Sequence, residues 1–93
     1  MKKPRTIKGE VLTRLAALPR DERAECMLAL IDLAQSFGQP HQHRGLGIRK
    51  LIKGVFECRG NLRLRFLFLD RSADLYVWML GDHNDVRAAL REI

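Results

Sequence analysis

The apolar residues of this 93-residue chain change their spacing partway along the sequence. Up to about residue 37 they recur every three or four positions, which places side chains on one face of an α-helix. From about residue 48 onward they alternate with polar residues, as in a strand that buries one face. The segment 38–47, GQPHQHRGLG, separates the halves and is rich in Gly, Pro and His. The chain is therefore predicted to fold as helices followed by a sheet.

The helical half is predicted to form an antiparallel hairpin. A first helix is expected over 9–18, where Pro19 ends a segment with apolar positions at Val11, Leu12, Leu15 and Leu18. A second helix is expected over about 20–37, with acidic residues in its first turn and Gly38 after its end. Its apolar stripe consists of Ala24, Met27, Leu28, Ile31, Leu33, Ala34 and Phe37. The short loop at Pro19 brings the two helices side by side.

The second half is predicted to form strands and one closing helix. The strand candidates are 48–52, 54–59, 62–69 and 74–80, with breaks at Gly54, Gly60-Asn61 and Asp70–Ala73. Asp82 can cap a helix over 83–91, with Asp85 three residues later and with Val86, Ala89 and Leu90 as its apolar positions. We therefore predict one α+β domain over residues 1–93: an N-terminal helical hairpin packed on a small antiparallel sheet of three to four strands, with a short C-terminal helix.

The turn after 54–59 decides which side of the sheet carries Glu57. A two-residue turn at Gly60-Asn61 would place Glu57 among the Leu and Phe side chains of the next strand. A turn longer by one residue, or a bulge, places Phe56 and Cys58 there instead. Burying an unpaired charge costs far more than forming a bulge, so we predict the bulged turn. The charged face would then hold Glu57 opposite Arg63, with Arg59 and Arg65 nearby.

The charge of the chain is concentrated in residues 44–65. This segment has seven Lys/Arg residues and one acidic residue, a net +6 that equals the formal net charge of the whole chain. Like charges held together repel one another unless an anionic partner neutralises them. A nucleic-acid backbone or an acidic protein segment would meet this need.

The cysteines and histidines do not form a metal-binding pattern. Cys26 lies in a helical pattern and Cys58 in a strand pattern, without the spacing of metal ligands, so we interpret both as reduced core thiols. His41 and His43 could begin a metal site, but no Cys, Asp or Glu lies near them in the sequence. We expect no metal and no cofactor.

Nothing in the sequence indicates a membrane protein. Hydrophobic residues make up 46% of the chain and charged residues 30%, which is typical of a folded soluble domain. The apolar runs are too short to span a bilayer, and the N-terminus MKKPRTIKGE lacks the apolar segment of a signal peptide. We expect a cytoplasmic protein with no membrane partner; its homo-oligomeric state is left open.

Four short motifs, in order, resemble the characteristic block of the RelE/ParE toxin superfamily. They are Lys50-Leu51, Val55-Phe56-Glu57-Cys58-Arg59, Leu62-Arg63-Leu64-Arg65-Phe66 and Leu80-Gly81-Asp82-His83-Asn84-Asp85-Val86. The helical hairpin with its LPRDER turn is also similar to the N-terminal half of that family, so the resemblance covers roughly residues 10–90. It implies a RelE/ParE-like fold and a toxin of a bacterial toxin–antitoxin pair.

The resemblance implies RNA cleavage through the ribose 2′-hydroxyl. This reaction needs a base for the 2′ proton, cations for the pentavalent phosphate and an acid for the leaving 5′ oxygen. Glu57 is expected to be the base and His83 the acid, with Arg63 and Arg65 as the phosphate clamp. Which of the two arginines occupies the family position is left open. The scheme requires no metal.

Three functions share this fold, and the sequence leaves them open. The leading hypothesis is an endoribonuclease that cleaves mRNA at the ribosome, with a cognate antitoxin whose acidic or amphipathic segment wraps the helices. The second is a non-enzymatic inhibitor of DNA gyrase, and the third an inactive, RNA-binding member. The expected RNA-binding residues are Arg44, Arg49, Lys50, Lys53 and Arg59.

Overall fold

The computed structural model describes residues 3–38 and 45–93. In chain order the elements are β1 (Arg5–Ile7), α1 (Gly9–Ala17), α2 (Arg20–Ser36), β2 (Arg49–Lys50), β3 (Val55–Arg59), β4 (Arg65–Asp70), β5 (Leu75–Gly81) and α3 (His83–Arg91). The predicted α+β class is confirmed, and all three helices lie within one residue of their predicted bounds. No helix in these two ranges is long and apolar enough to cross a membrane.

The sheet has five strands in the order β1-β5-β4-β3-β2. The sheet has more strands than the predicted three to four, because β1 was not among the predicted strands; it runs parallel to β5. The other neighbouring strands are antiparallel, as expected. β1 has only three residues and no apolar alternation, so it carries little signal in the sequence. Its register is fixed by the backbone, since the Lys8 N–H donates to the Val77 carbonyl at 2.9 Å and the Leu75 N–H to the Pro4 carbonyl at 2.9 Å.

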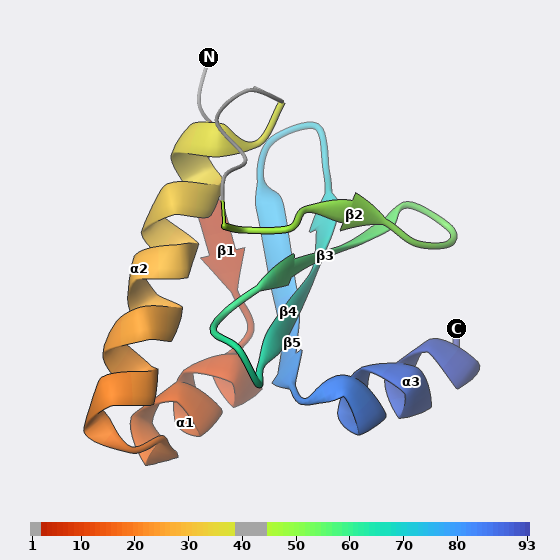
Figure 1. Cartoon of the computed structure of the whole chain (residues 1–93). Coiled ribbons are helices and arrows are strands. Elements are labelled where there is room, and N and C mark those ends of the chain that lie inside the picture. Colours follow the sequence, from red (N-terminus) through yellow and green to blue (C-terminus); the bar gives the residue numbers. More distant parts are fainter. Residues whose placement is uncertain (1–2, 39–44) are drawn as a thin grey trace.

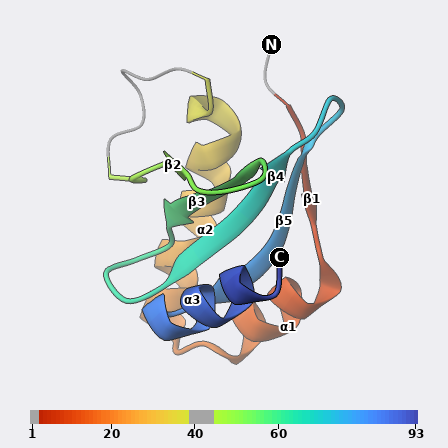
Figure 2. The same cartoon turned by 90° about the vertical axis from the view of Figure 1, so that its right-hand side faces the viewer.

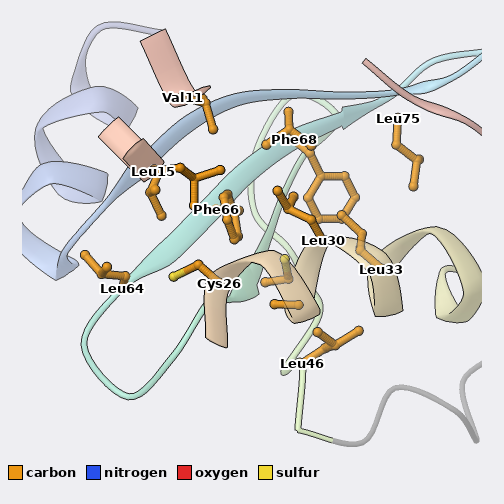
Figure 3. Packing of buried hydrophobic residues seen from close by; sticks show 14 residues of the cluster. Val11, Leu15, Cys26, Leu30, Leu33, Leu46, Leu64, Phe66, Phe68 and Leu75 are labelled. Atoms are coloured by element: carbon orange, nitrogen blue, oxygen red, sulfur yellow. The ribbon is translucent and has the colours of Figure 1, made fainter. Parts of the chain in front are cut away.

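The molecule has three layers (Figure 1). Helices α1 and α2 cover one face of the sheet, and α3 lies across the other, as the turned view in Figure 2 shows. The larger core lies between the hairpin and the sheet and includes Phe66, Phe68 and Leu33 (Figure 3). A smaller core of Val55, Leu67 and Val86 lies beneath α3. The two faces of the sheet are therefore covered unequally.

Helix α2 buries only part of the stripe that its sequence predicts, since Leu33 lies in the larger core and Phe37 packs against it. Its buried residues are Cys26, Ala29, Leu30, Leu33 and Ser36, and Figure 3 shows Cys26, Leu30 and Leu33 beside the aromatic side chains of β4. Met27, Leu28 and Ile31 from the predicted stripe are instead 51%, 60% and 46% exposed. Apolar residues surround most of this helix, so periodicity alone could not select the inner face. The side that packs carries smaller residues and fits against the large rings of the sheet.

The β3–β4 pairing confirms one part of the predicted register and corrects another. The connection spans residues 60–64 and is longer than two residues, so Phe56 and Cys58 face the larger core as predicted. Glu57 is paired with Leu67, however, and not with Arg63. The reason is that the Asn61 side-chain oxygen accepts hydrogen bonds from the N–H groups of Arg63 (2.8 Å) and Leu64 (2.7 Å). This Asx turn takes up residues that were predicted to begin the strand.

Both cysteines are free thiols buried in the larger core, which confirms their interpretation as core residues. Burial raises the pKa of Cys26 to about 11 and that of Cys58 to about 12. Thiols with such pKa values remain protonated at neutral pH and are poor nucleophiles. Their role is packing between α2 and β3.

Candidate active site

Charged residues that are distant in the sequence meet where three strands end. Arg59, the last residue of β3, pairs across the sheet with Arg65, the first residue of β4. Arg65 also pairs with Gly81, the last residue of β5, and α3 begins at His83 two residues later. The antiparallel pairing thus gathers the ends of β3 and β5 and the starts of β4 and α3 at one edge of the sheet.

A cavity of about 360 Å³ lies at this edge. It is lined by Gly47, Ile48, Arg49, Glu57, Arg59, Arg65 and His83. Side chains alternate along a strand, and Glu57 and Arg65 share the face of the sheet that carries Leu67 beneath α3. The structure therefore brings together Glu57, Arg65 and His83 from the predicted catalytic set.

Arg63 does not belong to this cavity. Its guanidinium binds the Glu22 carboxylate of α2 through Nε (3.1 Å) and Nη2 (3.0 Å), and the Asn61 amide donates to the same carboxylate at 3.0 Å. The hydrogen bond from Arg63 is the main reason why the pKa of Glu22 lies below its usual value. Arg63 therefore ties the β3–β4 connection to α2, and of the two predicted clamp arginines it is Arg65 that lines the cavity.

Glu57 is a buried carboxylate, only 7% exposed, with a cationic partner on the neighbouring strand. Arg49 of β2 is its cross-strand neighbour and donates to Oε1 from Nε (3.1 Å) and Nη2 (2.7 Å). A buried charge needs such a partner, because its loss of hydration is otherwise uncompensated. Both hydrogen bonds go to one oxygen, and Oε2 receives none from the residues described. Sequence reasoning placed Arg49 among the RNA-binding residues and missed this pair, because the short β2 strand gave no register.

Two arginines of the cavity carry no carboxylate partner within residues 3–38 and 45–93. Arg65 makes long contacts of 3.4 Å from Nη1 to the carbonyls of Asn61 and Leu64, which hold its side chain over the turn. The backbone N–H of Arg59 donates to the Leu46 carbonyl at 2.5 Å, and its guanidinium lies beside Gly47. Arginine presents a planar fork of donors that matches phosphate oxygens. Arg59 and Arg65 are therefore suited to bind a phosphate at this edge.

A capping box fixes the position of His83. The Asp82 side chain accepts from the Asp85 N–H at 2.9 Å, and the Asp85 side chain accepts from the Asp82 N–H at 3.0 Å. The hydrogen bond from the Asp85 N–H is the main cause that lowers the pKa of Asp82. Gly81 is required here, because a Cβ atom at this position would lie 2.5 Å from the Asp85 Cβ. The predicted cap is thus confirmed and presents an exposed His83 at the first turn of α3.

Two of the predicted RNA-binding residues, Lys50 and Lys53, do not line the cavity and are exposed on the β2–β3 segment. Arg44, His41 and His43 lie outside the described residues. Within those residues, no three His, Cys, Asp or Glu side chains are grouped in a way that could hold a metal ion.

The opposite face of the molecule has an apolar groove. Its volume is about 370 Å³, and it is lined by Arg5, Ile7, Leu12, Leu15, Ala16, Arg23, Met27, Leu30 and Ile31 from β1, α1 and α2. Arg5 donates to the Leu30 carbonyl at 2.8 Å and Arg23 to the Ala16 carbonyl at 3.4 Å. Neither guanidinium has a carboxylate partner among the residues described. Exposed Leu12, Met27 and Ile31 make this groove a candidate partner surface.

Two solved structures share this arrangement of helices and strands. One is an archaeal RelE–RelB complex from Pyrococcus horikoshii, with a TM-score of 0.71, 15% identity, and coverage of 88% of this chain and 96% of the other. The second is a YoeB–YefM complex from Staphylococcus aureus, with a TM-score of 0.62, 14% identity, and coverage of 89% and 99%. No protein-family model and no curated protein matches the chain. At these identities the likeness shows the fold, which is RelE-like, as the sequence motifs implied.

Proposed function

We propose that the chain is the toxin of a bacterial toxin–antitoxin pair and that it cleaves mRNA at the ribosome. The observation that carries this proposal is the cavity that joins a buried carboxylate, two arginines without carboxylate partners and an exposed histidine. These are the groups needed to cleave RNA through its own 2′-hydroxyl. The RelE-like fold supports the same conclusion.

The proposed mechanism assigns one step to each side chain. Glu57 takes the 2′-hydroxyl proton through Oε2, the carboxylate oxygen left open by Arg49. The 2′ oxygen then attacks the phosphorus, and Arg65 and Arg59 hold the charged phosphate oxygens. His83 gives a proton to the leaving 5′ oxygen, and the positive end of α3 favours a phosphate beside it. The products are a 2′,3′-cyclic phosphate and a 5′-hydroxyl.

A cognate antitoxin is the second part of the proposal. The two solved structures compared above are complexes with a partner chain, RelB in one and YefM in the other. In this chain the α1–α2 groove offers exposed apolar side chains between Arg5 and Arg23. An antitoxin segment with apolar residues for the groove and carboxylates for the two arginines would fit this surface.

The experiment is induced expression in a bacterial host that lacks the antitoxin, with growth and RNA 5′ ends followed in one culture. We expect growth arrest with new 5′ ends inside translated mRNAs. His83→Gln should abolish both, whereas Arg20→Gln, an exposed change on α2, should abolish neither. Arrest with intact mRNA and an induced DNA-damage response would instead favour gyrase inhibition. Absence of arrest would favour an inactive member of the fold. The proposal places the protein in the cytoplasm, where mRNA is translated.

A further inference from the structure

Two sides of helix α3 are occupied by contacts with the rest of the molecule. Val86, Ala89 and Leu90 pack in the smaller core against the sheet. On a second side Asp85 forms an ion pair with Arg14 of α1 at 3.0 Å. Ala88 lies on that side as well, because it lines the same cavity as Asp85 and Arg14.

The third side of α3 carries His83, Arg87 and Arg91. Residues four apart on a helix are neighbours on its surface, so these three form one row. All three are exposed, and neither arginine forms an ion pair within the described parts of the chain. The row begins in the cavity, which His83 lines, and it faces away from the α1 contact. Figure 2 shows α3 crossing this open face of the sheet.

The helix dipole favours only one of the two arginines. Arg91 lies in the last turn, where a cation interacts favourably with the helix dipole. Arg87 lies one turn earlier, without a carboxylate partner in the described structure. Both arginines nevertheless continue the four-residue spacing that starts with His83 in the cavity, which points to one role for the whole row.

We infer that Arg87 and Arg91 form a second phosphate-binding surface, which holds the RNA backbone as it leaves the cavity. This inference rests on the proposed function for the identity of the ligand as RNA. The helix rise places Arg87 about 6 Å and Arg91 about 12 Å along the axis from His83. Arg59 and Arg65 line the cavity in which the row begins. Cations thus continue from the scissile phosphate along α3.

Salt dependence of RNA binding tests this surface directly. The probe is a fluorescent single-stranded RNA with 2′-O-methyl riboses, which cannot be cleaved through the 2′-hydroxyl. Each phosphate contact adds about 0.7 to the slope of log K against log salt for single strands. The double variant Arg87→Gln/Arg91→Gln should therefore reduce that slope by about 1.4, with the same loss for every RNA sequence. The variant Arg87→Lys/Arg91→Lys should retain the slope, because its charges remain.

The matched control is Lys8→Gln/Arg20→Gln, which removes the same charge from two exposed positions that line neither the cavity nor the α1–α2 groove. Its slope should equal that of the unaltered protein. An unchanged slope in the α3 variant, or an equal decrease in both variants, would overturn the inference. Cleavage of unmodified mRNA at the ribosome is measured in parallel. A reduced slope without any cleavage would support the α3 surface and contradict the nuclease, while cleavage with an unchanged slope would contradict the surface alone.

Discussion

The two faces of the sheet differ in the side chains that they leave exposed. On the α1–α2 face, two helices cover the strands, the larger core is closed, and the exposed groups of interest are apolar. On the α3 face, one nine-residue helix covers only part of the sheet, and the uncovered edge holds a carboxylate, arginines and a histidine. The comparison indicates that exposed side chains of the helical face can be changed without loss of chemistry, whereas the arginines without carboxylate partners at the cavity serve the chemistry more than the stability.

The largest expected effect is the loss of RNA cleavage when a side chain of the cavity is removed. Arg65→Ala should lower the rate of mRNA cleavage at the ribosome by at least about 100-fold, because it removes a cation from the charged phosphate. The thermal midpoint should change little, since Arg65 makes no ion pair in the described structure and only two long hydrogen bonds. Rate and thermal midpoint are measured on the same purified variants.

The matched change on the other face is Met27→Ser in the groove. It should leave the cleavage rate within about twofold of the unaltered protein, because Met27 is half exposed and lies across the sheet from the cavity. An equal loss of cleavage in both variants would contradict the assignment of catalysis to the cavity and of partner binding to the α1–α2 groove.

The next effect in size compares two leucines of α2. Leu33 is fully buried, so Leu33→Ala should lower the free energy of unfolding by about 2–5 kcal/mol. Leu28 is exposed on the same helix, and Leu28→Ala should change the free energy of unfolding by less than about 0.5 kcal/mol. Urea unfolding of both variants measures the difference. Similar losses of unfolding free energy in both variants would mean that the exposed residues Met27, Leu28 and Ile31 of α2 are buried in solution, for example by self-association.

A smaller effect is expected from a substitution in the α1–α2 groove. Ile31→Asp places a carboxylate among exposed apolar side chains and should weaken binding of the antitoxin by about 10-fold or more. Cleavage in the absence of antitoxin should persist, so cells that express both proteins should lose protection. Isothermal titration with the purified antitoxin measures the affinity. Unchanged affinity would place the partner elsewhere on the molecule.

The smallest effect is a loss of stability in acid that arises on both faces. Hydrogen bonds from Arg71, and then from Thr6, lower the pKa of Asp74 to about 2. The pKa values of Glu22 and Asp82 are lowered as well, so the unfolded chain binds more protons than the native protein in acid. Stability should therefore be full above about pH 5 and fall as the pH decreases from about 4 towards 2. Thermal midpoints measured across this pH range test the expected decrease in stability. The decrease should be smaller in the Asp74→Asn variant.

Helix positions were predictable because local signals decide them. The Pro19 break, the Asp82 cap and the change of spacing after residue 37 all act within a few residues. The inner face of α2 was not predictable in this way, since it depends on the shape of the Phe66 and Phe68 surface it meets. β1 was missed for a similar reason, because a three-residue strand is defined by its partner β5.

The candidate site was predictable in part through strand alternation. Preferring a longer turn put Phe56 and Cys58 in the core, and this choice placed Glu57 and Arg65 on the outer face. The role of Arg63 depends on the Asx turn at Asn61 and on Glu22 of a distant helix, which no local pattern reveals. The Arg49–Glu57 pair likewise required the observed register of the two-residue strand β2.

The most direct test of the central claim is cleavage of an mRNA that carries a single 2′-deoxynucleotide at the mapped cut site, with translating ribosomes and the purified protein. If Glu57 activates the 2′-hydroxyl, cleavage should vanish at that bond and continue at unmodified sites, with 5′-hydroxyl ends on the products. Cleavage at the deoxynucleotide, or products with 5′-phosphate ends, would contradict the proposed mechanism.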